Sequence, residues 1–199
     1  MSGIAIIDSG GANIASLLYA FERLGREAQL TTDSSIIRSA ERVLLPGVGA
    51  AKDAMDRLRS TQLIDVIRGL QQPVLGICLG MQLLCEASEE ENVDCLGIVP
   101  GTALKLAATT ECPVPNMGWC MTHQVTKDPV LDGVDNDSFF YYLHSYALPV
   151  GDCTIATADH ERTFSAMVRQ RNFVAAQFHP ERSSAAGARL LKNFLEMPS

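Results

Sequence analysis

The sequence lacks the features that mark membrane, secreted and nucleic-acid-binding proteins. No apolar run reaches the roughly 18 residues that a membrane-spanning helix needs. The start, Met1-Ser2-Gly3-Ile4, has neither a basic region nor a long apolar segment, so no signal peptide is expected. The formal net charge is −7 and no basic cluster is present, which argues against nucleic acid as a partner.

Paired cysteines and metal-ligand spacings are also missing. The six cysteines include no C-x-x-C pair, and the four histidines are scattered. We therefore expect reduced thiols in a cytoplasmic protein, with no metal site and no cofactor. The length of 199 residues, 47% of them apolar, predicts a single domain over residues 1–199 with a large core.

The first half alternates apolar runs with helical patterns. Buried strands are expected at 4–7, 29–31, 43–45 and 73–75, and helices at 14–24, 54–58 and 63–67, the first of them capped by Asn13. Strands that are apolar throughout are typical of a parallel sheet covered by helices on both faces. The turn Gly10-Gly11-Ala12-Asn13 does not match G-x-G-x-x-G, so no dinucleotide site is expected.

The second half is different in character, because most of it has the pattern of strands. These are expected at 119–125, 138–144, 154–158, 164–169 and 173–178, joined by short turns as antiparallel hairpins. A closing helix is expected over 185–195, capped by Ser183 or Ser184. The predicted fold class is α/β, an open and mostly parallel sheet with helices on both faces and added antiparallel strands.

The stretch Gly76-Ile77-Cys78-Leu79-Gly80 stands at a junction between a strand and a helix. The form G-x-C-x-G describes a nucleophile elbow, in which glycines remove side chains that would clash in the sharp turn. The N-terminus of the following helix favours an anion such as a thiolate. The alternative is that Cys78 is only a small buried apolar residue, as most free cysteines are.

Two further segments carry chemistry. Pro46-Gly47-Val48-Gly49 follows a parallel strand, at the edge where open α/β sheets bind ligands, and its N–H groups are free to face developing negative charge. In His179-Pro180-Glu181 the carboxylate can reach the imidazole, as in the base and orienting pair of a triad. The alternative for Pro46-Gly47-Val48-Gly49 is a tight turn that binds no ligand. The alternative for His179-Pro180-Glu181 is a solvated turn.

Taken together, these stretches and Gln177-Phe178-His179-Pro180-Glu181 resemble the class I, or triad, glutamine amidotransferases over nearly the whole chain. The resemblance implies a flavodoxin-like fold and a Cys78-His179-Glu181 triad that hydrolyses L-glutamine to glutamate and ammonia through a thioester. It also implies an oxyanion hole made by the backbone N–H groups of Leu79 and of the Val48-Gly49 loop.

The resemblance further implies a set of glutamine contacts: Gly49, Gln82, Glu90, His144, Ser145 and Tyr146. Glu90 would pair with the substrate ammonium, although it also fits a solvated acidic run, Glu89-Glu90-Glu91. His144 is interpreted as pocket wall rather than as a second base, because no carboxylate lies near it in sequence to orient it.

Within the family, the resemblance is strongest to glutaminase subunits that form a heterodimer with a (βα)8-barrel synthase subunit in histidine biosynthesis. Trp119, the only tryptophan, would face that partner, with a buried core position as the alternative. Asn116 and Cys120 stand where the family often has His and Asn, and Arg182 replaces a frequent lysine. This leaves details of partner contact and activation open.

Three other interpretations compete with this one. The chain could be the glutaminase of another biosynthetic pathway, a cysteine peptidase of similar fold, or a non-catalytic scaffold. Gln82 and the spacing of His179 and Glu181 favour an amidotransferase over a peptidase. The complete set of Cys78, His179 and Glu181 argues against a scaffold.

Overall fold

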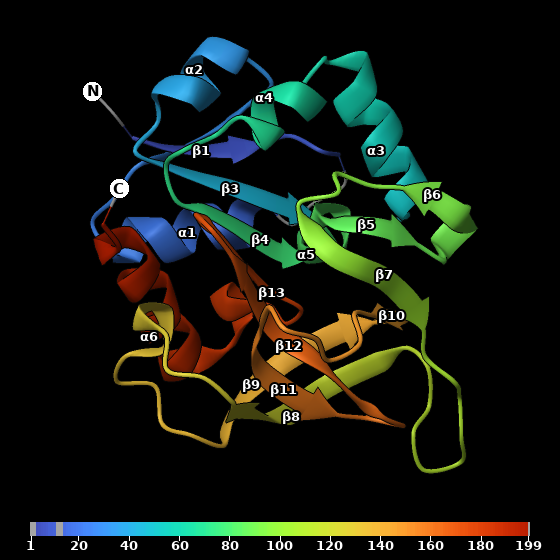
Figure 1. Cartoon of the computed structure of the whole chain (residues 1–199). Helices are drawn as coiled ribbons and strands as arrows, with labels where there is room; N and C mark the ends of the chain where they lie inside the picture. The colour runs from blue at the N-terminus through green and yellow to red at the C-terminus, as the bar shows by residue number, and fades with distance from the viewer. Residues whose placement is uncertain (1–2, 11–13, 199) are drawn as a thin grey trace.

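The computed structural model describes residues 3–10 and 14–198, so the expected cap at Asn13 lies outside the described residues. Its centre is a nine-stranded sheet in the order β2-β1-β3-β4-β13-β12-β11-β8-β9 (Figure 1). The parallel part consists of β2 (Ala28–Thr31), β1 (Ile4–Ile7), β3 (Arg42–Gly47), β4 (Val74–Cys78) and β13 (Phe173–Ala176). The antiparallel part consists of β12 (Thr163–Gln170), β11 (Thr154–Asp159), β8 (Asn116–Gln124) and β9 (Ser138–His144).

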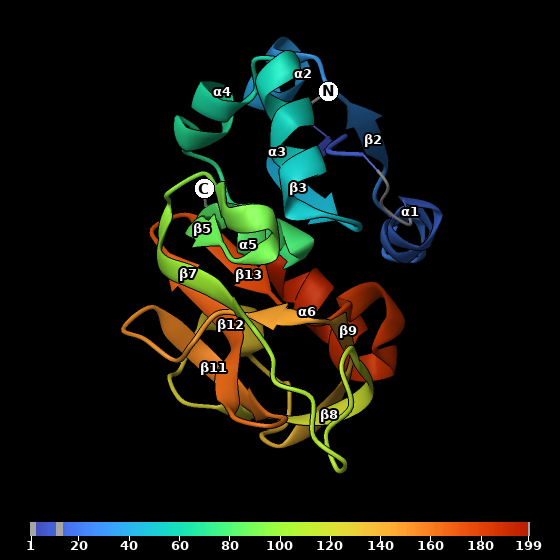
Figure 2. The ribbon, with the colours of Figure 1, turned by 90° about the vertical axis from the view of Figure 1, so that its right-hand side faces the viewer.

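Helices cover both faces of the parallel strands, because these strands bury apolar side chains on both sides. In β1, Ile4 and Ile6 pack with α1 (Ile14–Arg23) and α6 (Ser184–Glu196). Ala5 and Ile7 point the other way and pack with residues of α2, α3, α4 and α5. These four helices span Ser34–Ser39, Ala51–Ser60, Ile64–Arg68 and Leu79–Leu84 (Figure 2). The expected fold class is confirmed.

A smaller sheet lies beside the large one, in the order β10-β7-β5-β6. Its strands are β10 (Tyr146–Ala147), β7 (Val99–Lys105), β5 (Cys85–Ser88) and β6 (Val93–Asp94). A short 3-10 helix, Glu90–Asn92, leads from β5 to β6. None of the helices in the described part of the chain is long and apolar enough to span a membrane.

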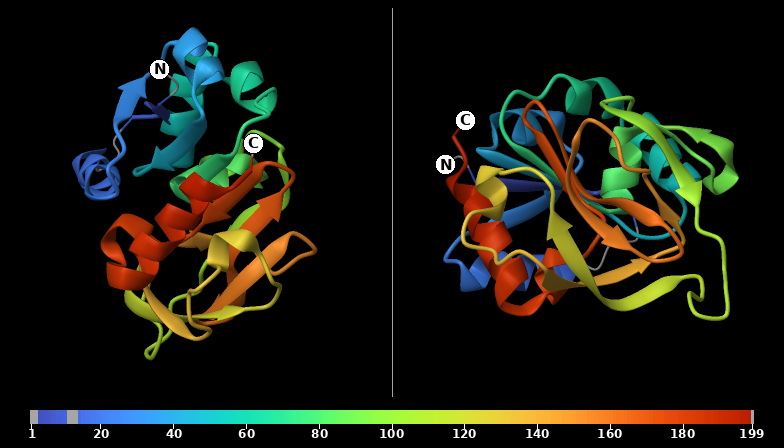
Figure 3. Two further views of the ribbon diagram at one scale, coloured as in Figure 1. Left: turned by 90° about the vertical axis from the view of Figure 1, so that its left-hand side faces the viewer. Right: turned by 60° about the horizontal axis from the view of Figure 1, so that its bottom comes forward.

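The antiparallel strands curve so that the edge of the sheet returns toward its centre (Figure 3). The Tyr141 carbonyl of β9 accepts a hydrogen bond of 2.9 Å from the N–H of His179, just after β13. Beside this contact the rings of Phe140 and Phe178 stack with their centroids 4.0 Å apart. This curvature brings β9 next to the end of β4, where Cys78 lies.

Several sequence-based expectations need correction in detail. The strand expected over 173–178 ends at Ala176. Gln177 N–H still bonds to the Ala166 carbonyl in the register of β12, but the chain then leaves this pairing, and His179 N–H bonds to the Tyr141 carbonyl of β9 instead. The expected side-chain cap of the closing helix is wrong. Ser183 occupies the N-cap position, but its hydroxyl donates to the His179 carbonyl at 2.6 Å and accepts from Tyr141 N–H.

Candidate active site

Cys78 is the last residue of β4, and α5 begins at the next residue. Its backbone has φ 55° and ψ −113°, a conformation that a non-glycine residue keeps only where its surroundings impose it. The surroundings are tight: a Cβ at Gly80 would lie 1.7 Å from the Leu45 carbonyl oxygen, and one at Gly76 would lie 2.9 Å from Leu84. A side chain at position 80 is therefore excluded by the backbone, and one at position 76 would force the packed side chains of Leu84 and Ala175 to shift.

His179 joins Cys78 to Glu181. Its Nδ1 lies 2.9 Å from Glu181 Oε1, which leaves the other ring nitrogen for Cys78. Burial by itself lowers the pKa of His179, but hydrogen bonds to the side chains of Cys78 and Glu181 outweigh it and raise the pKa to about 10. His179 therefore holds a proton at neutral pH and is placed to exchange it at the sulfur.

The second carboxylate oxygen of Glu181, Oε2, is buried and has no hydrogen-bond partner among the described residues. All of the polar contact seen for this carboxylate is thus directed at His179. In surroundings of low polarity such a pair interacts strongly, which favours the imidazolium form of His179.

A cavity of about 400 Å³ opens over Cys78. The structure brings together in its wall every residue that the sequence analysis placed at the site except Trp119: Val48, Gly49, Cys78, Leu79, Gln82, Glu90, His144, Ser145, Tyr146, His179 and Glu181. Three further wall residues, Pro115, Leu143 and Arg182, were not assigned to the pocket from the sequence.

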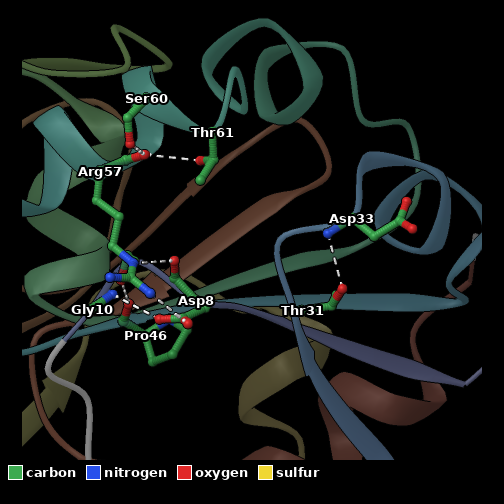
Figure 4. Close-up of polar contacts among 9 residues, drawn as sticks. Asp8, Gly10, Thr31, Asp33, Pro46, Arg57, Ser60 and Thr61 are labelled. Atoms are coloured by element: carbon green, nitrogen blue, oxygen red, sulfur yellow. Dashed lines mark hydrogen bonds and ion pairs between the residues drawn. The ribbon is translucent and has the colours of Figure 1, made fainter.

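The end of β3, from which the Val48-Gly49 loop starts, is held in place by the residues that follow β1. Ser9 Oγ donates a hydrogen bond of 2.7 Å to the Pro46 carbonyl. The preceding residue, Asp8, forms an ion pair of 2.7 Å with Arg57 of α3 (Figure 4). Gly49 has φ 89°, which suits glycine. This loop and the first residue of α5 line the same cavity as Cys78.

Gln82 and Glu90 have fixed positions in the cavity wall. Gln82 Nε2 donates to the Tyr146 carbonyl at 2.9 Å and to Gln177 Oε1 at 3.1 Å. Glu90 Oε2 accepts a hydrogen bond of 2.7 Å from Ala51 N–H at the start of α3. Glu90 is thus attached to a helix N-terminus while its side chain still faces the cavity, and its pairing with a substrate ammonium stays a prediction.

His144 has partners on both ring nitrogens. Nδ1 lies 2.9 Å from the Tyr146 carbonyl, and Nε2 lies 3.1 Å from Asn116 Nδ2. Burial lowers the pKa of His144 to about 4, against the opposing effect of the Tyr146 carbonyl. A neutral imidazole with both nitrogens occupied fits the wall role expected from the sequence.

Trp119 lies outside the cavity, on the outer face of β8, with 52% of its surface exposed. A core position is therefore excluded. It pairs across the strands with Tyr141, and the same face carries the neighbouring pairs Met117–Leu143 and Met121–Phe139. We call these six residues the β8–β9 patch.

Comparison with known proteins places this geometry in a family. The model of the glutamine amidotransferase class-I family matches residues 5–197, and the chain belongs to this family. It is 49% identical over 197 residues to "imidazole glycerol phosphate synthase subunit HisH" of Xanthomonas campestris pv. campestris (strain 8004), covering 99% of this chain and 98% of that protein.

The protein of the same description from Vibrio cholerae serotype O1 is 45% identical over 200 residues, with 98% of each chain covered. Among solved structures, a glutamine amidotransferase from Thermotoga maritima superposes with a TM-score of 0.67 at 18% identity. That match covers 98% of this chain and 81% of the other, and it shows the shared fold.

Proposed function

We propose that this chain is the glutaminase subunit of an imidazole glycerol phosphate synthase. It hydrolyses L-glutamine to glutamate and ammonia, and the ammonia passes to a synthase subunit that makes imidazole glycerol phosphate and AICAR in histidine biosynthesis. The observation that carries the proposal is the Cys78-His179-Glu181 arrangement at the bottom of a cavity, in a chain 45–49% identical to synthase subunits of that description.

In the proposed reaction, the Cys78 sulfur attacks the side-chain amide carbon of glutamine. The oxyanion that forms is stabilised by the N–H groups of Leu79 and the Val48-Gly49 loop. Loss of one such donor typically costs roughly 2.7–4 kcal/mol of transition-state stabilisation. His179 delivers its proton to the departing ammonia, and Glu181 holds the imidazole in orientation. Water activated by His179 then hydrolyses the thioester to glutamate.

The cavity wall supports glutamine as the substrate. Gln82 directs both hydrogens of its amide into the protein, which leaves Oε1 as an acceptor for the substrate. The Glu90 carboxylate provides negative charge for the substrate ammonium. Gly49, Ser145 and Tyr146 contribute backbone and side-chain polar groups, and His144 closes the wall as a neutral ring.

The β8–β9 patch supports a partner surface beside the cavity. Met117 and Phe139 are exposed at 67% and 52%, and contiguous apolar surface of this kind marks interaction sites. Leu143 belongs both to the patch and to the cavity wall, and its carbonyl lies 3.6 Å from the Cys78 sulfur. A (βα)8-barrel synthase subunit bound there as a heterodimer would sit next to the point where ammonia is released.

Two broader features agree with the proposal. The large sheet draws strands from both ends of the chain, which supports one domain over residues 1–199. All six cysteines are free thiols, as expected of a cytoplasmic enzyme.

The decisive experiment measures glutamate release from glutamine by the chain alone, and then with the barrel subunit loaded with its ribonucleotide ligand. Strong stimulation by the loaded partner is the expected result. Turnover that ignores this partner would assign the glutaminase to another pathway. Absence of turnover in both conditions would contradict the glutaminase assignment and favour a peptidase or a scaffold.

A further inference from the structure

Gln177 is a buried polar residue that the proposed reaction does not use. It follows β13 and has no exposed surface. Its side chain lies between two residues of the site: Oε1 is 3.1 Å from Gln82 Nε2, and Nε2 is 3.9 Å from the Cys78 sulfur. A buried amide in such a position either takes part in the site or stabilises the fold. The direction of its hydrogen bonds indicates which of these roles it has.

The direction of this amide follows from a single backbone carbonyl. The oxygen of Tyr146 can only accept, so Gln82 must present its NH₂ group to it. The same NH₂ group donates its second hydrogen to Gln177, which must therefore offer Oε1. The Gln177 NH₂ group is then left to face the Cys78 sulfur. No other orientation of the two amides satisfies all three contacts.

The contacts of the sulfur are of opposite kinds. The Leu143 carbonyl, 3.6 Å away, can only accept, so it suits a protonated thiol. The Gln177 N–H can donate, and donation to a charged atom is stronger than donation to a neutral one. His179 approaches as the third group and carries the proton. Among the described residues, Gln177 is thus the one side-chain amide that donates toward the sulfur, and this contact favours the anionic sulfur over the neutral one.

We infer that Gln177 is a further residue of the reaction centre, which directs an N–H at the Cys78 sulfur and thereby favours and orients the thiolate for attack. The inference rests on the proposed function for its kinetic consequence, but the contact with the thiolate can be tested without turnover. The chain Tyr146–Gln82–Gln177–Cys78 also links the glutamine pocket to the nucleophile through hydrogen bonds alone.

Two substitutions and one control separate this role from a structural one. Gln177→Glu keeps the shape and still accepts from Gln82, but it places an oxygen where the N–H faces the sulfur. Gln177→Met keeps the approximate length and removes both hydrogen bonds. The matched control is Asn193→Leu, which removes a buried amide that donates to the carbonyls of Val130 and Asp132, outside the cavity.

The first measurement is the rate of Cys78 alkylation by iodoacetamide as a function of pH, with the modified residue identified by peptide mass spectrometry. We expect Gln177→Glu to move the midpoint of the Cys78 profile upward by about one pH unit or more, and Gln177→Met to move it upward by less. Asn193→Leu should leave the midpoint at the wild-type value even though it lowers the melting temperature.

The second measurement is steady-state glutamate release in the complex with the barrel subunit. We expect kcat of Gln177→Glu to fall roughly tenfold or more at neutral pH, with a smaller change in KM and partial recovery at higher pH. If Gln177→Glu fails to fold, the alkylation midpoint and the rate of glutamate release are compared between Gln177→Met and the wild type instead.

Unchanged alkylation midpoints in the Gln177 variants would overturn the inference and show that Gln177 has only a structural role. A rise in KM without a fall in kcat would do the same. The pH profile of alkylation tests the role of Gln177 without requiring that the protein turn over glutamine. If the wild-type chain releases no glutamate, the proposed function fails while the profile still answers the question asked of Gln177.

Discussion

Asn116 Nδ2 lies 3.1 Å from His144 Nε2, and the partners of the two ring nitrogens together settle the tautomer of the histidine. The other ring nitrogen, Nδ1, faces the Tyr146 carbonyl and must carry the hydrogen. Asn116 Oδ1 in turn accepts from the Cys120 thiol at 3.4 Å. Asn116 and Cys120 are two of the three positions at which the sequence is expected to depart from the family pattern, and here they act together as support for the pocket wall.

The first prediction concerns Asn116→Leu. Removal of the amide leaves His144 Nε2 buried without a donor, which costs about 1–3 kcal/mol and loosens the ring. Because the ring forms wall and carries no proton in the reaction, we expect KM for glutamine to rise several-fold while kcat changes little. Asn116→His should restore much of the affinity, since a ring N–H can donate. A fall in kcat with KM unchanged would contradict the wall role.

The second prediction concerns the dependence of stability on pH. Because burial lowers the pKa of His144 to about 4, the unfolded chain takes up this proton near pH 6.5 and the folded chain does not. The contribution of uncharged His144 to the free energy of unfolding is therefore fully present above pH 6.5 and is lost as pH falls toward 4. His160 and His179 act on His144 in the same direction as burial.

This dependence can be measured against His144→Gln by urea unfolding. Between pH 6.5 and 4, the free energy of unfolding of the wild type should fall relative to that of the variant, by up to about 3 kcal/mol. Parallel curves for the two proteins would show that His144 is not the group responsible.

The sequence predicts those parts of the candidate site that depend on short, continuous motifs. The elbow at Cys78 combines an apolar strand, two glycines and a following helix within a few residues, and His179 and Glu181 are two positions apart. Short segments were missed for the opposite reason. Helix α2 has six residues and depends on the Asp33 cap, whose carboxylate accepts from Ser35 N–H at 2.7 Å. No periodic apolar pattern of useful length marks it.

The remaining features depend on pairings between distant strands. Placement of β13 beside β4 brings His179 to Cys78, although β13 and β4 are separated by most of the second half of the chain. The contact between Asn116 and His144 follows from their pairing in the β8–β9 register. Strand patterns predict that hairpins exist, but the register and the curvature of the sheet arise from packing of the whole core.

The third prediction is that Cys78→Ala abolishes glutamine hydrolysis and leaves partner binding intact. The substitution removes the attacking atom, and the β8–β9 patch lies on the outer face of the sheet, where the loss of one sulfur has little effect. Glutamate release and the dissociation constant for the synthase subunit should be measured on the same preparation. Retained turnover would exclude Cys78 as the nucleophile.

The fourth prediction ranks the other two members of the triad. His179→Ala removes the group that carries the proton, so kcat should fall by roughly 10²–10⁴ or more. Glu181→Ala should cost less, because the imidazole remains. It should also lower the pKa of His179, since the Glu181 hydrogen bond is one of the contacts that raise it. A larger loss of kcat for Glu181→Ala than for His179→Ala would reverse the assigned roles.

The fifth prediction concerns the β8–β9 patch. Trp119 stands at its middle: its ring lies edge-on to Tyr141, with centroids 6.2 Å apart, and the Arg182 guanidinium lies over Tyr141 at 4.2 Å. Central aromatic residues surrounded by apolar neighbours carry most of the energy in protein interfaces. Trp119→Ala should therefore weaken binding of the synthase subunit by about 2 kcal/mol or more, roughly 30-fold.

The matched control is Tyr19→Ala on α1, which removes an aromatic side chain of similar exposure, 61%, outside the patch. Titration calorimetry with the synthase subunit should find the wild-type dissociation constant for this control. The glutaminase activity of Trp119→Ala without partner should also equal that of the wild type, because Trp119 does not line the cavity. At saturating partner its stimulated turnover should approach the wild-type rate, since Leu143 still connects the patch to the nucleophile. An unchanged dissociation constant for Trp119→Ala would place the partner on another face of the molecule.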